Sequence, residues 1–215
     1  MTQAAVLMLR DPPAFTRLLM AARSGPVEHA SSAQADAADV HDCRAGDQDA
    51  FRRLIERHQA RIAALMWHFT RDREAHAELV QDVFVEAWRA LASYRGEAPF
   101  EHWLARIATR TGYRFWRRRE GERRVASVPL EDCPELRAPE ELEPSRAAEL
   151  LQRLLGELPP RDRLVLTLRY LQERSVRETA ELTGWSPTMV KVQAWRARGK
   201  LLRRFEQATR EAEDE

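Results

Sequence analysis

The sequence has few cysteines and no long hydrophobic run. Only Cys43 and Cys133 are present in 215 residues, and neither lies in a CxxC pair. This argues against both a disulfide scaffold and a structural zinc site, and it fits a reducing cytoplasm. Charged and proline residues at positions 10–13 interrupt the apolar start, and nothing later approaches the ~20 apolar residues of a membrane span. We expect a cytoplasmic protein with no signal peptide, membrane insertion, metal or cofactor.

An excess of one charge and recognisable catalytic motifs are also missing. Lys and Arg number 35 against 34 Asp and Glu, for a net charge of +1, so any attraction to nucleic acid must be local. There is no glycine-rich phosphate loop, HExxH or nucleophile elbow, and we therefore expect neither an enzyme nor a small-molecule substrate. With only eight glycines and abundant Ala, Leu, Arg and Glu, the composition favours an all-α fold.

Helical periodicity predicts a first domain at residues 46–120, with three to four helices. Apolar residues recur at spacings of three and four, as one buried helix face requires. The residues expected to be buried are Phe51, Leu54, Ile55, His58, Ile62, Leu65, Met66, Phe69, Val80, Val83, Phe84, Ala87, Trp88, Leu91, Trp103, Leu104, Ile107 and Ala108. Gly96 and Pro99 break the helical pattern. Residues 1–45 have one brief apolar cluster and are expected to form a weakly ordered extension.

The charge changes sign after the first domain. From Val125 to Glu149 seven acids face two arginines, a net −5, with four spaced prolines. Such a segment stays extended, so residues 121–144 are predicted to be a flexible acidic linker. A second domain of four helices is expected at residues 145–207, followed by a short tail at 208–215.

The second domain has the spacing of a helix-turn-helix. Ser175 and Glu178 form a predicted capping box, and Ser186 and Pro187 are typical of the start of a new helix. The positions for a close helix crossing, a left-handed turn and a core contact are Ala180, Gly184 and Val190. In this motif the second helix enters the DNA major groove.

Two basic surfaces support nucleic-acid binding. Residues 189–210 hold seven bases and one acid, a net +6. In the first domain four arginines share one helix face at spacings of four, four and three, namely Arg106, Arg110, Arg114 and Arg117. Phosphate contact requires such local positive charge, although a basic helix is often only a solvated face.

Four motifs in order resemble a known family. They are ELVQDVFVEAWRAL, SYRGEAPFEHWLARIA, LPPRDRLVLTLRY and SPTMVKVQAWRARGKLL. Together they are similar to a bacterial RNA polymerase sigma factor of the extracytoplasmic-function (ECF) group. Residues 46–120 resemble region 2, residues 145–207 resemble region 4, and the acidic segment stands in place of region 3.

The resemblance implies a role in promoter recognition with three sets of site residues. Glu78, Gln81 and Asp82 match the face that grips the β′ clamp coiled coil of core polymerase. The residues that match −10 recognition, in a base-capturing loop and a basic helix, are Tyr94, Arg95, Gly96, Glu97, Arg106, Arg110, Arg114 and Arg117. Those that match −35 recognition are Ser186, Thr188, Lys191, Gln193, Arg196, Arg198 and Lys200. The other implied partners are the β flap, promoter DNA and an anti-sigma factor.

Several points differ from the family or stay open. Arg110 and Arg114 stand where the family usually has Asn and Asp, and Val192 and Gln193 replace its Ser-Arg; Gln193 could read adenine. Trp116 either stacks on DNA or packs on the domain edge. The linker is a plain tether, or it threads past the polymerase active centre. A stand-alone helix-turn-helix regulator is the alternative function, although it leaves the first domain unused.

Overall fold

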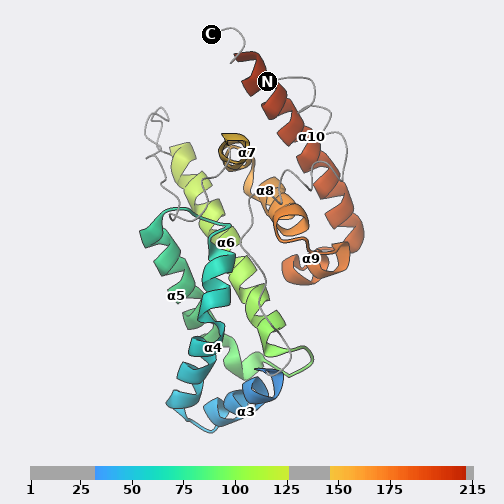
Figure 1. Ribbon diagram of the computed structural model, residues 1–215. Helices are drawn as coiled ribbons and strands as arrows, with labels where there is room; N and C mark the ends of the chain where they lie inside the picture. The colour runs from blue at the N-terminus through green and yellow to red at the C-terminus, as the bar shows by residue number, and fades with distance from the viewer. Residues whose placement is uncertain (1–31, 126–145, 212–215) are drawn as a thin grey trace. The chain divides into compact units, whose positions relative to one another are not determined.

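The fold is all-α and divides into two units. The computed structural model describes residues 32–125 and 146–211, and every regular element within these ranges is a helix (Figure 1). Contacts separate the chain into two compact units. We call residues 32–125 the N-terminal helical unit and residues 146–211 the C-terminal helical unit. The predicted fold class, two small helical domains, is confirmed; most of the predicted linker lies outside the described residues.

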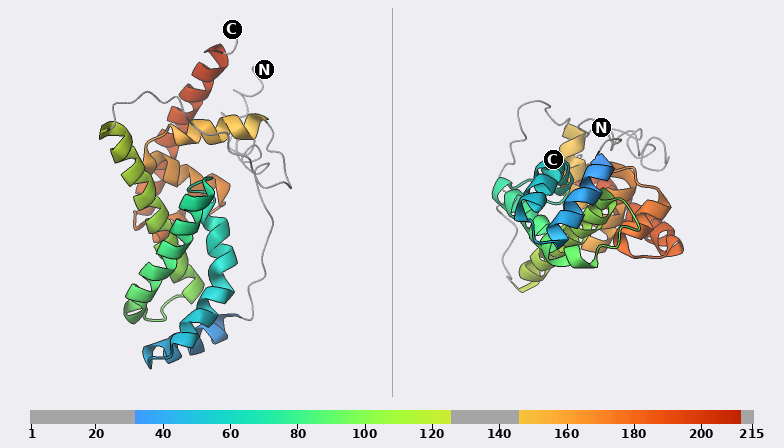
Figure 2. Two further views of the ribbon diagram at one scale, coloured as in Figure 1. Left: turned by 90° about the vertical axis from the view of Figure 1, so that its left-hand side faces the viewer. Right: turned by 90° about the horizontal axis from the view of Figure 1, so that it is seen from below.

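The N-terminal helical unit consists of four α-helices and one short turn of 3₁₀ helix. They are α3 (Ser32–Arg44), α4 (Gln48–Met66), α5 (Arg73–Ala90), η1 (Leu91–Ser93) and α6 (Phe100–Val125). Asp47 caps α4 by accepting the Asp49 amide, and Asp72 caps α5 by accepting the Ala75 amide. Figures 1 and 2 show α3, in blue, lying across the end of the unit where α4 starts.

The predicted helix faces form most of the core of this unit. The buried side chains among them include Leu54, Ile62, Met66, Phe69, Val83, Ala87, Leu91, Leu104 and Ala108. Trp88 was predicted to be buried and is instead 45% exposed. Its ring meets the Phe51 ring edge-on at 4.8 Å on the flank of α4 and α5, which leaves its other side in solvent. The half-buried members of the predicted set are Phe51, Ile55, Leu65, Val80, Trp103 and Ile107.

Trp116 resolves one of the open alternatives. Its side chain is 5% exposed, and its ring lies 4.5 Å from the ring of Phe69. The indole nitrogen donates a hydrogen bond of 2.6 Å to the Phe69 carbonyl oxygen. Trp116 therefore packs inside the unit, and its ring is not available to stack on DNA.

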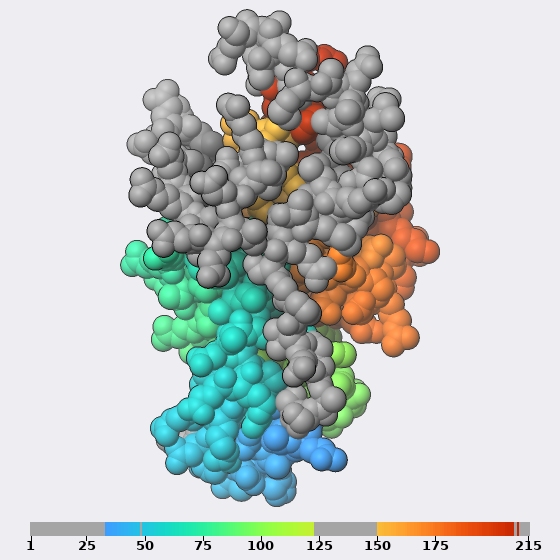
Figure 3. Space-filling view, in the orientation of Figure 1, coloured from blue at the N-terminus to red at the C-terminus, as the bar shows by residue number. Residues whose placement is uncertain are grey.

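Three predicted boundaries need correction. Residues 32–44 are not a weakly ordered extension but helix α3, which packs on α4 and has Val40 and Cys43 buried. Figure 3 shows the blue atoms of α3 lying directly against those of α4. Helix α6 continues past the predicted linker start at 121 to Val125, because a single Gly121 between good helix formers interrupts a helix only weakly. Helix α10 continues past 207 to Glu211, with Ala208 packed on the core.

The C-terminal helical unit contains the predicted four α-helices. They are α7 (Arg146–Gly156), α8 (Pro160–Leu166), α9 (Val176–Thr183) and α10 (Pro187–Glu211), with a π-helical segment, η2 (Thr167–Leu171), directly after α8. Leucines of α7 and α8 and the face of α10 around Val190, Ala197 and Leu201 form one core. This core fixes α10 against α8 and α9.

The local geometry of the helix-turn-helix is confirmed. Ser175 and Glu178 form the capping box, and these hydrogen bonds hold the pKa of the Glu178 carboxyl below its ordinary value. Gly184 has φ 75°, in the left-handed region, where a side chain would be strained. Ser186 accepts the Met189 amide at the start of α10.

Candidate nucleic-acid interface

The basic face of α6 is present as predicted. Arg106, Arg110, Arg114 and Arg117 are all exposed, while Ala108 between them is buried in the unit. Farther along the helix, Arg119 lies over the Phe115 ring with its guanidinium carbon 4.9 Å from the ring centroid. Such a stacked guanidinium keeps its charge exposed at a fixed position. The arrangement can follow the phosphates of a nucleic-acid strand.

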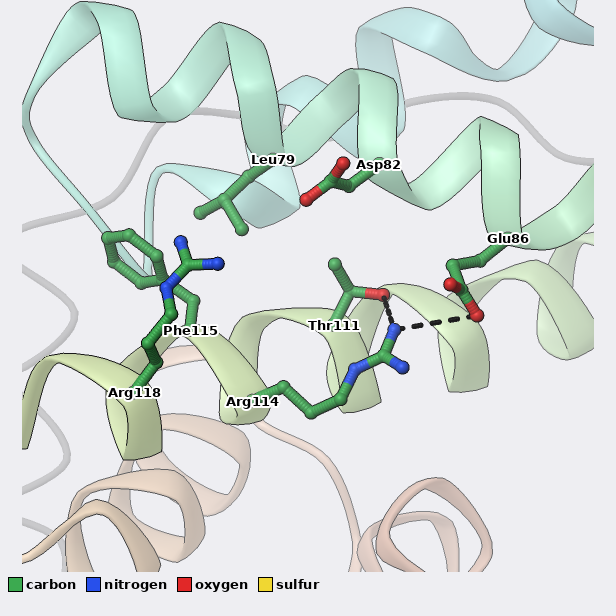
Figure 4. Close-up of a pocket in the computed structure, with 7 residues that line it drawn as sticks. All are labelled: Leu79, Asp82, Glu86, Thr111, Arg114, Phe115 and Arg118. Atoms are coloured by element: carbon green, nitrogen blue, oxygen red, sulfur yellow. Dashed lines mark hydrogen bonds and ion pairs between the residues drawn. The ribbon is translucent and has the colours of Figure 1, made fainter. Parts of the chain in front are cut away.

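A pocket of about 310 Å³ lies between α5 and α6. Its lining is Leu79, Asp82, Glu86, Thr111, Arg114, Phe115 and Arg118 (Figure 4). Arg114 donates to the Thr111 hydroxyl at 3.2 Å and lies 3.5 Å from a Glu86 oxygen. Acids of α5 and arginines of α6 therefore face each other across this groove. Of the four predicted arginines, Arg114 is the one that already has an acidic neighbour.

The loop between η1 and α6 has a fixed base and an exposed tip. Tyr94 is half-buried, its ring lies against those of Phe100 and Trp103, and its hydroxyl donates to the Ala98 carbonyl at 2.7 Å. Burial raises the pKa of the Tyr94 hydroxyl, and the negative charge of Asp36 adds to this shift. The predicted residues of the tip are exposed, and they are Arg95, Gly96 and Glu97.

The outer face of α5 carries both polar and apolar exposed residues. The predicted set of Glu78, Gln81 and Asp82 is exposed. Val85 and Trp88 lie on the same side at helical spacing and are 38% and 45% exposed. An exposed apolar strip beside carboxylates is typical of a protein-binding face rather than a solvated one. The sequence shows the helical spacing, but its periodicity places Trp88 in the core.

The exposed face of α10 contains three of the predicted residues, Thr188, Lys191 and Arg196. Trp195, at 72% exposed, and Val192, at 42%, lie among them. Neither was predicted as a site residue. Neither residue belongs to the helical repeat of buried residues formed by Val190, Ala194 and Ala197. This periodicity is the sequence feature that could have identified them as exposed. An apolar ring or methyl on a major-groove helix can contact a thymine methyl.

Two predicted −35 residues, both half-buried, are bound by a buried carboxylate. Asp162 of α8 is 1% exposed. It accepts a hydrogen bond from the side-chain amide of Gln193 and one of 2.6 Å from the Lys200 ammonium. The adenine contact predicted for Gln193 would therefore require a bond to Asp162 to break. Arg198 is half-buried, and Ser186 is exposed at the helix start.

A further arginine lies beside the start of α10. The Arg161 guanidinium sits 4.9 Å from the centroid of the Trp185 ring, and one of its nitrogens is 3.6 Å from the Met189 sulfur. No feature of the sequence predicted this contact, since it joins α8 to the turn before α10. It places one more exposed positive charge next to the helix-turn-helix.

Other site types are not indicated in the described ranges. Within residues 32–125 and 146–211 no group of three His, Cys, Asp or Glu could hold a metal ion. Cys43 is buried, and burial raises the pKa of its thiol. None of the helices so described is long and apolar enough to cross a membrane.

Comparisons with known proteins agree with this geometry. Residues 54–122 match the family model of Sigma-70 region 2, and residues 148–201 match that of Sigma-70, region 4. The ECF RNA polymerase sigma-E factor of Escherichia coli strain K12 is 31% identical over 163 residues, covering 71% of this chain and 85% of that protein. The sigma-E factor of Haemophilus influenzae is 28% identical over 173 residues, covering 76% and 91%.

Two solved structures are similar in fold. CnrH in complex with the cytosolic domain of CnrY has a TM-score of 0.51 and 28% identity, and covers 80% of this chain and 98% of that one. The sigma factor RpoE of Bartonella quintana, in complex with the anti-sigma factor NepR, has a TM-score of 0.55 and 20% identity, covering 73% and 96%. The matches extend over both helical units. The chain belongs to the ECF family of RNA polymerase sigma factors.

Proposed function

We propose that this chain directs core RNA polymerase to promoters by gripping two DNA elements with its two helical units. The observation that carries the proposal is that each unit presents a helix with an exposed basic face, and that each unit matches a separate sigma region. Two basic modules on one chain can bind two sites on one promoter. The protein needs no catalysis of its own for this task, and it works in the cytoplasm.

In the N-terminal helical unit, Glu78, Gln81 and Asp82 bind the β′ clamp coiled coil of the polymerase. Val85 and Trp88 extend this contact with apolar area. The −10 strand lies on the basic face of α6, and the exposed tip at Arg95, Gly96 and Glu97 captures an unstacked base. Backbone charge and a small base pocket are sufficient for single-strand capture.

In the C-terminal helical unit, α10 enters the major groove of the −35 element, and the β flap binds the same unit. Ser186, Thr188, Lys191, Arg196 and Arg198 contact DNA, with Trp195 beside them. Gln193 and Lys200 act through Asp162, which holds α10 against α8. An anti-sigma factor restrains the free protein, a proposal supported by the anti-sigma complex of the Bartonella quintana sigma factor.

Binding to core polymerase tests the proposal directly. We expect the full chain to co-elute with core RNA polymerase in gel filtration and to support run-off transcription from a randomised promoter library. The variant Asp82→Arg should lose co-elution, because it reverses a charge in the proposed polymerase contact. A chain that binds duplex DNA alone and never co-elutes would instead be a stand-alone helix-turn-helix regulator.

The two basic faces should be separable by mutation. Arg196→Ala is expected to weaken −35 duplex binding about 10-fold, because the loss of one charge-assisted contact costs about 1–2 kcal/mol, and to spare −10 single-strand binding. Arg110→Ala should have the reverse effect. Fluorescence anisotropy of holoenzyme with each DNA measures both, so that each variant is the control for the other. Equal losses on both DNAs would refute the division of labour.

A further inference from the structure

Helix α3 is held on the N-terminal helical unit by buried ion pairs. Asp36 and Asp39, 3% and 6% exposed, both accept from Arg57 of α4, at 2.5 and 2.7 Å. Asp36 also lies 3.0 Å from Nε2 of buried His58. Burial alone would raise the pKa of Asp39, but hydrogen bonds from Arg57 and Arg53 outweigh it and hold that pKa below its usual value. The register of α3 on α4 is therefore fixed.

The C-terminal end of α3 reaches the loop that the proposed function assigns to base capture. Helix α3 packs against η1, which leads into this loop. The guanidinium of Arg44, the last residue of α3, donates a hydrogen bond to the carbonyl oxygen of Tyr94, 50 residues away. Arg44 is itself exposed, so its side chain is not part of the core. Its described contact is with the loop backbone.

The point of contact is the place where the loop conformation is set. Tyr94 follows η1 directly, and its amide donates to the Leu91 carbonyl at 3.2 Å. After Tyr94 the chain turns through Gly96, with φ 74°, and the tip is exposed. The tip has only an exposed ion pair of 3.9 Å between Arg95 and Glu97. The direction in which the tip leaves the unit therefore depends on the Tyr94 peptide on one side, and on the bond from the Tyr94 hydroxyl to the Ala98 carbonyl on the other.

We propose that Arg44 is a positioning residue for −10 recognition, because its guanidinium fixes the Tyr94 peptide and so holds the base-capturing loop in its binding shape. The inference rests on the proposed function of this loop and adds a residue outside it. A loop held in its bound shape loses less conformational freedom when it captures a base. Without Arg44 the loop still carries the same side chains, but fewer of its conformations form the pocket.

The test compares three variants in holoenzyme with core polymerase. Arg44→Met removes the donor, Arg44→Lys keeps the charge and can restore one hydrogen bond, and Arg52→Met is the matched control. Arg52 is on α4, its side chain is 70% exposed, and its described ion pair is a surface one with Asp49. Both methionine variants change the net charge equally. Thermal melts establish that all three retain the wild-type fold.

The readout is selectivity for the captured base rather than affinity alone. The probes are a single-stranded oligonucleotide that the wild-type holoenzyme selects from a randomised pool, and the same oligonucleotide with an abasic site at the captured position. We expect Arg44→Met to reduce the ratio of the two affinities about 10-fold, Arg44→Lys to recover part of it, and Arg52→Met to leave it unchanged. Binding to −35 duplex should be unaffected by all three.

Other outcomes would overturn the inference. If Arg44 contacted a phosphate directly, Arg44→Met would weaken the binding of both oligonucleotides equally. The ratio of the two affinities would then stay at its wild-type value. An unchanged affinity for both would equally exclude a positioning role. A wild-type holoenzyme that assembles and selects no oligonucleotide would contradict the proposed function itself, and the role of Arg44 with it. A wild-type holoenzyme that selects an oligonucleotide, with an unchanged ratio in Arg44→Met, would contradict the role of Arg44 and leave the proposed function intact.

Discussion

Replacing Gly112 by alanine should destabilise the N-terminal helical unit by about 2–3 kcal/mol, as overpacking of a closed core does. A Cβ built on Gly112 would lie 2.4 Å from ring atoms of Phe69, far inside van der Waals contact. The Phe69 side chain is 1% exposed, and its ring lies against that of Trp116, so it has no free space to enter. The close approach of α6 to the turn that follows α4 therefore requires a glycine.

Gly121→Ala is the matched control on the same helix. Nothing lies within 4 Å of a Cβ at this position, and the residue is exposed. Alanine should stabilise α6 there by about 0.5–1 kcal/mol through helix propensity. Urea denaturation, with hydrogen exchange to assign the loss to residues 32–125, measures both variants. Similar stabilisation by the two substitutions would contradict the tight contact at Gly112.

Replacing Asp162 by alanine should destabilise the C-terminal helical unit by about 2–3 kcal/mol. The carboxylate is buried and joins α8 to α10 by accepting from Gln193 and Lys200. Removing one partner of a buried pair costs about 3–5 kcal/mol. The expected loss is smaller because the Lys200 side chain is 44% exposed and can turn to solvent. The half-buried Gln193 amide cannot do so as easily.

Glu157→Ala provides the control for this pair. Glu157 also reaches α10, through a 3.1 Å ion pair with Arg204, but the two side chains are 37% and 50% exposed. Surface pairs of this kind contribute about 0–1 kcal/mol. Denaturation midpoints and −35 duplex binding should both fall for Asp162→Ala and barely change for Glu157→Ala. Equal effects of the two variants would show that the buried Asp162 carboxylate contributes no more to stability than a surface ion pair.

Local physical rules were sufficient for most of the fold. The capping box at Ser175, the left-handed turn at Gly184 and the buried contact of Val190 follow from the conformational preferences of a few neighbouring residues. Helical spacing identified most of the core for the same reason, since one periodic face must be buried. These features depend on residues that are close in sequence, so a single sequence is sufficient to predict them.

Partners distant in sequence explain where prediction failed. Residues 32–44 look weakly ordered alone because the acids that hold α3 find their partners, Arg53, Arg57 and His58, on the next helix. Trp88 fits a buried stripe and is nevertheless half exposed, because packing leaves one side of its ring uncovered. Gln193 and Lys200 fit a DNA-binding helix, but Asp162, more than 30 residues earlier, accepts hydrogen bonds from both of their side chains.

The sequence alone therefore determined the all-α class, the two basic helices, the turn between α9 and α10, and the family resemblance, because each depends on spacing along the chain. The tertiary structure decided which polar side chains remain available to a partner. In the folded chain, Gln193 and Lys200 donate hydrogen bonds to the buried Asp162 carboxylate. The Trp195 side chain is left exposed, and Arg44 contacts a loop 50 residues away. Exposure and pairing are set by contacts between helices, and the spacing of residues within one helix does not specify them.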